Sequence, residues 1–289
     1  MHKFSLAAAV GAFAASAALA STAQAGEVEI RNTVARVVVI AEDRTDIQVS
    51  VDLGSSGLPA IEIRRRGDDV FIEGGLRRRI QDCRSNVFVG DPTQMPSGVS
   101  VEVRDHGRVE MAQAPLIVIR TPMNVDIDAE GAVWGAIGRA DNVELGAGGC
   151  GDWSVGNVQN SLSVAVGGSG DVRTGTAQAL EVAVGGSGDV RTGAVTSAEL
   201  AVGGSGDITV ASVNGATDIA IGGSGEVTIN GGRAPAMDIG IGGSGTVIFN
   251  GEAGDVDVAI AGSGDVRIAR VTGRVDRAIV GSGDIRIGE

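Results

Sequence analysis

The sequence predicts a nearly all-β protein, folded as a single-stranded parallel β-helix (β-solenoid) with about 19 residues and two short strands per coil. Gly-Ser-Gly turns recur every 18 to 20 residues, and apolar columns keep the same register from repeat to repeat. The composition agrees: 47 of the 289 residues are Gly and only 2% are aromatic. Such a mixture suits narrow stacked strands better than a helical or sandwich core.

Residues 1–25 have the features of a signal peptide. A positive start ends at Lys3, an Ala-rich apolar run continues to Ala20, and Ala23-Gln24-Ala25 fits the small-residue cleavage rule. No later run approaches the ~20 apolar residues that cross a bilayer, so we expect no membrane span. We expect a soluble mature chain from Gly26, in the periplasm or outside the cell, with irregular β-rich coils in 26–125 and the regular repeat in 126–289.

The turns define the repeat. Each has a central serine with glycine on either side, and the serines are Ser169, Ser187, Ser205, Ser224, Ser244, Ser263 and Ser282. Cys150 holds the same place one coil earlier, and a degenerate coil at 130–134 would bring Trp134 and Trp153 into register in the core. We expect glycine here because the reversals need positive φ and stacked turns leave little room for side chains. The turn Ser and Asp are expected to bond local amides.

The columns between turns predict which side chains face inward. Three residues before each serine lie Val166, Val184, Val202, Ile221, Ile241, Ile260 and Ile279, and five before lie Val164, Val182, Leu200, Ile219, Ile239 and Val258. A second inward set follows each turn, from Val172 to Ile285. Period-2 alternation then places outward a small column of Ala165, Ala183, Ala201, Ala220, Gly240, Ala259 and Ala278, and an acidic column of Glu181, Glu199, Asp218, Asp238, Asp257 and Asp276.

Residues 27 to about 125 contain further strands, which we interpret as the first, irregular coils of the solenoid. The runs Arg64-Arg65-Arg66 and Arg77-Arg78-Arg79 are expected on turns or exposed edges, either as solvated loops or as a basic docking patch. An oxidising compartment would allow a disulfide between Cys83 and Cys150, but two separate buried thiols fit the sequence equally well.

Calcium binding is the main alternative interpretation of the turns. Gly-Gly-x-Gly with Asp is similar to the calcium-binding nonapeptide of parallel β-rolls, and Asp152, Asp171, Asp189, Asp207, Glu226, Asp265 and Asp284 would supply oxygens. However, the Asp comes one place early, and only one such turn occurs per coil. Arg173 and Arg267 stand two places after Asp171 and Asp265, and we expect each to pair with its Asp. We therefore assign the turns a structural role and expect no cofactor.

An enzyme is a second alternative, because carboxylates on β-helices can cleave glycosides. The mature chain holds one histidine, His106, in a polar stretch, so neither a triad nor a His-based metal site can form. Sugar-cleaving clefts also usually carry aromatic platforms, which are scarce here. We therefore expect a protein without catalytic residues.

The tandem turns at Ser169 through Ser282, with flanking Val and Ile strands and an irregular β-rich N-terminal part, resemble the bacterial family named putative auto-transporter adhesin, head GIN domain. The resemblance implies an exported right-handed β-helix shaped like the pectin lyases, without their catalytic residues, and a role in cell adhesion. This sequence shows no translocator barrel, lipobox or sorting tail, so self-anchored adhesion is not expected of it.

These features together predict a non-enzymatic surface or envelope interaction module. The formal charge of −13 disfavours nucleic acid and anionic membranes. We expect the partner to be an envelope or host-surface component, with glycans among the candidates. The flat Ala/Gly face suggests homo-oligomers, whereas Arg277 in the last coil opposes end-to-end stacking.

Overall fold

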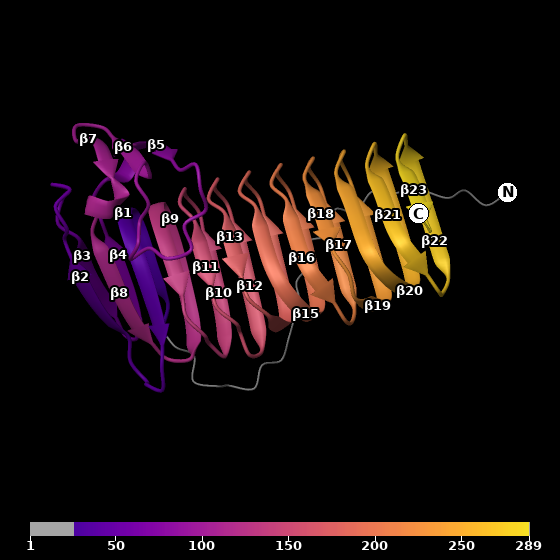
Figure 1. The fold of residues 1–289 in the computed structure, drawn as a ribbon, viewed down its shortest axis with the longest axis horizontal. Helices are drawn as coiled ribbons and strands as arrows, with labels where there is room; N and C mark the ends of the chain where they lie inside the picture. Colours follow the sequence, from indigo (N-terminus) through magenta and orange to yellow (C-terminus); the bar gives the residue numbers. More distant parts are fainter. Residues whose placement is uncertain (1–25, 289) are drawn as a thin grey trace.

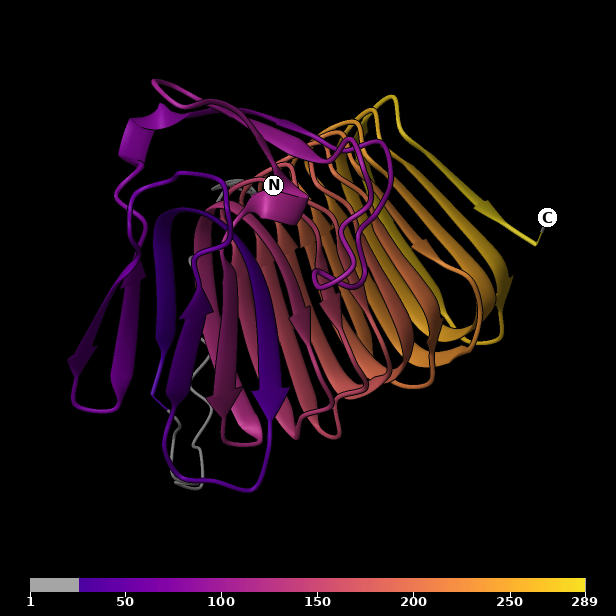
Figure 2. The same ribbon diagram turned by 60° about the vertical axis from the view of Figure 1, so that its left-hand side comes forward.

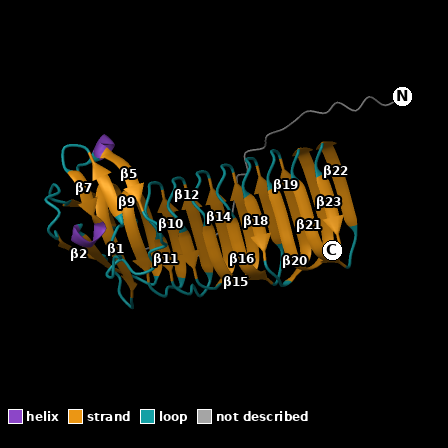
Figure 3. Cartoon of the chain, turned by 45° about the horizontal axis from the view of Figure 1, so that its top comes forward, coloured by secondary structure: helices purple, strands orange, loops and turns teal. Residues whose placement is uncertain are grey.

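The computed structural model describes residues 26–288, so the predicted signal peptide lies outside the described residues. The chain winds into about nine stacked coils of about 19 residues, and neighbouring coils pair in parallel (Figures 1 and 2). The predicted β-solenoid is confirmed. The two short 3-10 helices, η1 (Arg77–Arg79) and η2 (Met111–Gln113), both lie in the N-terminal part (Figure 3).

Two parallel sheets face each other across the core. We call one the first sheet; its strands are β4 (Asp69–Glu73), β1 (Val28–Ala41), β9 (Asn124–Ile137), β10 (Asn142–Ala147), β12 (Ser161–Val166), β14 (Ala177–Val184), β15 (Val190–Val202), β17 (Thr217–Ile221), β19 (Arg233–Ile241), β20 (Thr246–Gly262) and β22 (Val275–Gly281). Four of these strands, β1, β9, β15 and β20, are long enough to bend at a corner and enter the other sheet as well.

The second sheet contains the remaining halves of those four strands together with β8 (Leu116–Thr121), β11 (Trp153–Val155), β13 (Val172–Thr174), β16 (Ile208–Val213), β18 (Glu226–Ile229), β21 (Asp265–Val271) and β23 (Asp284–Ile287). A Gly-Ser-Gly turn connects the first sheet to the second in each regular coil. The two sheets therefore enclose one continuous core between them.

The inward columns stack as predicted. Val166 pairs with Val184 and Val184 with Val202, and each of the three side chains is 1% exposed. Burying a side chain of this size stabilises the fold by about 1.5–3 kcal/mol, and every coil repeats the contribution. The column ends at Ile279, which is 42% exposed because no strand covers β22 on its outer side within the described residues.

The turn glycines are required by close stacking. A Cβ on Gly204 would lie 2.0 Å from the carbonyl oxygen of Gly186, one coil earlier. The amide of Ser205 donates to that same oxygen at 3.0 Å, so the two turns are held close together by backbone hydrogen bonds. The expected positive φ was wrong for most of these turns: among the glycines flanking the seven serines, only Gly262 and Gly281 adopt it.

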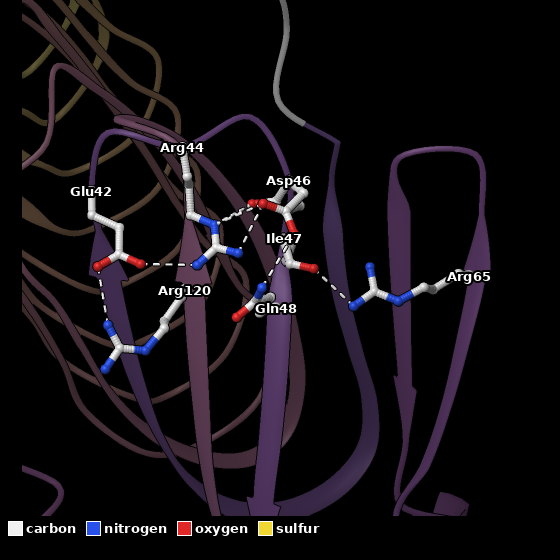
Figure 4. A network of polar contacts seen from close by, with 7 residues as sticks. All are labelled: Glu42, Arg44, Asp46, Ile47, Gln48, Arg65 and Arg120. Atoms are coloured by element: carbon white, nitrogen blue, oxygen red, sulfur yellow. Dashed lines mark hydrogen bonds and ion pairs between the residues drawn. The ribbon is translucent and has the colours of Figure 1, made fainter.

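The N-terminal end departs from the expected coils. Two strands there run antiparallel to their neighbours: β2 (Gln48–Asp52) on β8, and β3 (Glu62–Arg66) on β4. The turn between β3 and β4 is too short for a full coil, so the chain folds back on itself. A polar network joins the loop after β1 to β8 and β3: Arg44 lies between Glu42 and Asp46, Arg120 pairs with Glu42, and Arg65 donates to the carbonyl of Ile47 (Figure 4).

A separate antiparallel sheet covers one edge of the first coils. We call it the cap; it consists of β5 (Ile80–Arg84), β6 (Ser100–Val103) and β7 (Gly107–Glu110). It packs on a second apolar cluster that includes Leu76, Val101, Met111 and Trp134. The expectation that all of 27–125 forms coils is therefore wrong for the cap.

Trp134 also faces the cap, whereas the sequence analysis placed it in register with Trp153 in the solenoid core. Trp153 pairs with Gly135, because the coil between Ala132 and Cys150 is 18 residues long. A shift of one residue reverses the side of the strand that a side chain occupies. Trp134 is therefore buried under the cap, while Trp153 packs in the solenoid core. Both are 1% exposed, so neither offers a platform to a sugar.

Candidate interaction face

The outer face of the first sheet carries a row of carboxylates in register. We call this row the acidic stripe: Glu181 pairs with Glu199, and Asp218, Asp238, Asp257 and Asp276 follow on successive coils. The predicted outward column is confirmed. The structure also extends it beyond the sequence-based prediction, through Ser163 to Glu144, Asp126, Glu27 and Asp69.

Beside the acidic stripe runs the small column of the same strands, from Ala165 to Ala278 with Gly240 in the middle. Since these side chains are so short, a shallow groove of about 1020 Å³ forms along the C-terminal coils. Carboxylates of Glu199, Asp218 and Asp238 lie along it. The result is a flat face, acidic along one line and free of bulky side chains along the next.

The carboxylates of the acidic stripe have few positive neighbours. Within residues 26–288, only Asp276 at the far end forms an ion pair, with Arg274 at 3.4 Å. Burial together with Asp238 and Glu199 raises the pKa of Asp218 above its usual value. Nearer the N-terminus, burial and the charges of Glu144 and Glu27 raise the pKa of Asp126 to about 6. Stacked like charges therefore repel one another and are poised to gain from a positively charged partner.

The acidic residues of the turns accept hydrogen bonds from the backbone of the next coil. A carboxylate oxygen of Asp189 accepts the amide of Asp207 at 3.1 Å, and one of Asp207 accepts the amide of Glu226 at 2.8 Å. Similar bonds connect Asp152 to Asp171 and Asp171 to Asp189. The expectation of local turn bonds is corrected here, because these bonds connect one coil to the next. They explain why Asp follows Gly-Ser-Gly so regularly.

Neither of the predicted Asp–Arg pairs along the turn strands forms, although equivalent pairs form in two other coils. Arg191 lies 3.0 Å from Asp189, and Arg286 lies 3.0 Å from Asp284. The predicted pair of Asp171 with Arg173 is wrong, because the Arg173 guanidinium lies over the ring of Phe88 at 4.0 Å. No ion pair joins Asp265 to Arg267 among the described residues.

Cys83 and Cys150 are joined by a disulfide, with their Cα atoms 6.3 Å apart. The bond connects cap strand β5 to the turn of an early coil. The segment after Cys83 is also held, because the amide of Val89 donates to a carboxylate oxygen of Asp152 at 2.9 Å and the Ser154 hydroxyl donates to the carbonyl of Gly90 at 2.6 Å. Burial raises the pKa of Asp152, which is only 8% exposed.

The remaining candidate residues lie apart from one another. His106 is exposed at the turn between β6 and β7 and is the only histidine in residues 26–288. Arg64 and Arg66 project from the exposed edge strand β3, and Arg77–Arg79 form η1. Across residues 26–288, no group of three or more His, Cys, Asp or Glu side chains is arranged to hold a metal ion. The helices of this part of the chain are too short to span a membrane.

One known protein family matches the part of the chain whose coils form the groove of the first sheet. Residues 192–288 match the family described as putative auto-transporter adhesin, head GIN domain. The family resemblance is confirmed. The head GIN domain match covers the turns at Ser205 through Ser282 and most of the acidic stripe. A search of curated proteins found no match.

Two solved structures are similar to this chain, and both are described as putative adhesins. One is from Parabacteroides distasonis ATCC 8503, with a TM-score of 0.48 and 16% identity, and covers 93% of this chain and 94% of its own. The other is from Bacteroides fragilis NCTC 9343, with a TM-score of 0.43 and 15% identity, and covers 91% of this chain and 92% of its own.

Proposed function

We propose that the protein is an exported, non-enzymatic interaction module, and that the acidic stripe and the small column beside it form its contact face. The single observation that carries this proposal is the run of in-register carboxylates along the rod with almost no ion-pair partners. The adhesin family that matches residues 192–288 supports the same class of function.

The face favours a particular kind of partner. Flat, repeating surfaces suit extended polymers, and a column of carboxylates repels polyanions. The partner we propose is therefore an envelope or host-surface component that is neutral or positively charged, such as a neutral glycan. A second copy of the chain fits less well, because two such faces would bring their acidic stripes together unless they were offset.

The test measures binding of fluorescently labelled protein to isolated cell envelopes at low and high salt. The triple variant Glu199→Gln, Asp218→Asn, Asp238→Asn removes three charges from the face. The control variant Asp43→Asn, Asp68→Asn, Asp105→Asn removes three charges from exposed loops outside it. We expect the first variant to lose binding and the second to retain it. Equal binding by both variants would refute the proposed face.

The same preparation tests the non-enzymatic assignment. We expect the polysaccharides of the envelope to keep their size and to release no new reducing ends during long incubation with the protein. Release of sugar that stops in the Glu199, Asp218, Asp238 variant would establish the glycoside-cleaving alternative instead.

A further inference from the structure

A second concave surface lies where the cap meets the turns. It is a groove of about 520 Å³, within the range of small-ligand sites, and none of its lining residues belongs to the acidic stripe. One wall is formed by the start of η1 and the edge strand β5. The other is formed by the corner of β1 at Asn32 and the turns of the next three coils around Gly131, Gly149 and Ser169.

The walls of this groove are fixed in position. The disulfide joins Cys83 in the cap wall to Cys150 in the turn wall. At the corner of β1, the amide of Leu76, just before η1, donates to the carbonyl of Asn32 at 2.9 Å, and the Asn32 side-chain amide donates to Glu73 of β4 at 3.2 Å. Because the disulfide bridges the walls, an added β-strand cannot run freely along the edge of β5. The shape therefore favours a short ligand over an extended peptide.

Backbone strain is concentrated at the same place. Three non-glycine residues in the described part of the chain have positive φ, and two of them line the groove: Asn32 at 51° and Arg77 at 39°. Residues with a side chain seldom adopt such conformations, which cluster at active sites and ligand clamps.

The polar groups of the groove suit a ligand with many hydroxyls. Arg77 supplies donors, Gln81 both donates and accepts, and Asp82 and Glu130 accept on opposite walls. Two carboxylates beside one guanidinium disfavour an anion. We propose that this groove binds a short neutral oligosaccharide. The site goes beyond the contact face proposed above and is tested with different variants.

Calorimetric titration of the folded, oxidised protein with cellotetraose and maltotetraose tests the proposal, with trigalacturonate as the anionic comparison. We expect at least one neutral oligosaccharide to bind with Kd below about 1 mM and more tightly than trigalacturonate. Gln81→Ala and Glu130→Ala, which change exposed side chains on opposite walls, should each weaken binding about fivefold or more, as the loss of one hydrogen bond implies. Asp43→Asn, in an exposed loop that belongs neither to this groove nor to the contact face, should leave binding unchanged.

The disulfide provides a second readout. The double variant Cys83→Ser, Cys150→Ser should lose oligosaccharide binding while its circular dichroism spectrum remains that of a β-protein, because the disulfide holds the cap against the turns and the parallel pairing of the coils does not depend on it. The proposal is overturned if neither neutral oligosaccharide binds, if trigalacturonate binds more tightly, or if the groove variants and the disulfide variant bind as well as the parent.

Discussion

Replacing one turn glycine by alanine should damage the solenoid far more than the same change on the flat face. In Gly204→Ala the new Cβ would lie 2.0 Å from the Gly186 carbonyl oxygen, whereas ordinary contact begins at 3.4 Å, so the backbone of at least one of the two stacked turns must move. Overpacking of this kind costs about 1–3 kcal/mol. The hydrogen bond from Ser205 to Gly186 is lost as well, which adds about 1 kcal/mol. We expect the free energy of unfolding to fall by about 2–4 kcal/mol.

Gly240→Ala is the matched control. No atom lies within 4 Å of its added Cβ, and its register neighbours Ala220 and Ala259 already carry a methyl group there. This change should stabilise the fold by about 0.5 kcal/mol, because it restricts the unfolded chain. Urea titration followed by circular dichroism measures both variants, with the slope checked for loss of cooperativity. If Gly204→Ala costs no more than Gly240→Ala, close stacking is not the reason for the turn glycines.

Three further predictions concern charges and the disulfide. The pKa of Asp126 is raised from 3.8 in the unfolded chain to about 6 in the folded protein, so the folded state binds the proton more tightly. The free energy of unfolding should therefore fall as the pH rises from about 4 to about 6. In urea titrations across that range, Asp126→Asn should flatten this dependence. Asp207→Ala should lower the free energy of unfolding by about 1 kcal/mol, because the Glu226 amide loses its acceptor. Asp207→Asn should retain most of this stability, because its amide oxygen can still accept. Equal losses by the two variants in thermal melts would contradict a stabilising role for these bonds between coils. Reducing the Cys83–Cys150 disulfide, which spans 67 residues, should lower the free energy of unfolding by at most about 4 kcal/mol. Limited proteolysis of the reduced protein should cleave the cap before the coils. Simultaneous cleavage of the cap and the coils would show that the cap does not unfold separately.

Most of the solenoid could be predicted because its repeat makes each position visible several times. Val166, Val184 and Val202 occupy one column, and the same alternation places Glu181 and Glu199 outward. Inward and outward faces then follow from period 2 alone.

The N-terminal features could not be predicted in this way because each occurs only once. Gly67-Asp68 between two strand-like runs is a hairpin signal that indicates that β3 folds back on β4, but nothing in the sequence indicates that the cap covers Trp134. The acidic stripe was predicted only from Glu181 onward, since Ser163 interrupts it and the earlier coils lack the serine turn that marks the register.

The turn aspartates show a further limit. Sequence spacing indicates that Asp207 follows a turn, but the partner of its carboxylate, the amide of Glu226, is 19 residues away. A local turn motif and a bond between coils give the same pattern along the chain. Only the register of neighbouring coils distinguishes them.

Distances between spin labels along the small column test the stacked coils most directly. One label replaces Ala165, and the second replaces Ala220, Ala259 or Ala278 in three separate proteins. These positions lie three, five and six coils away from the first by register. The Cα separations are expected to be ~14, ~24 and ~29 Å, and the distances between labels measured by pulsed electron paramagnetic resonance should rise in that order by about 4.8 Å per coil. Distances that do not increase in this order would contradict the stacking on which the contact face depends.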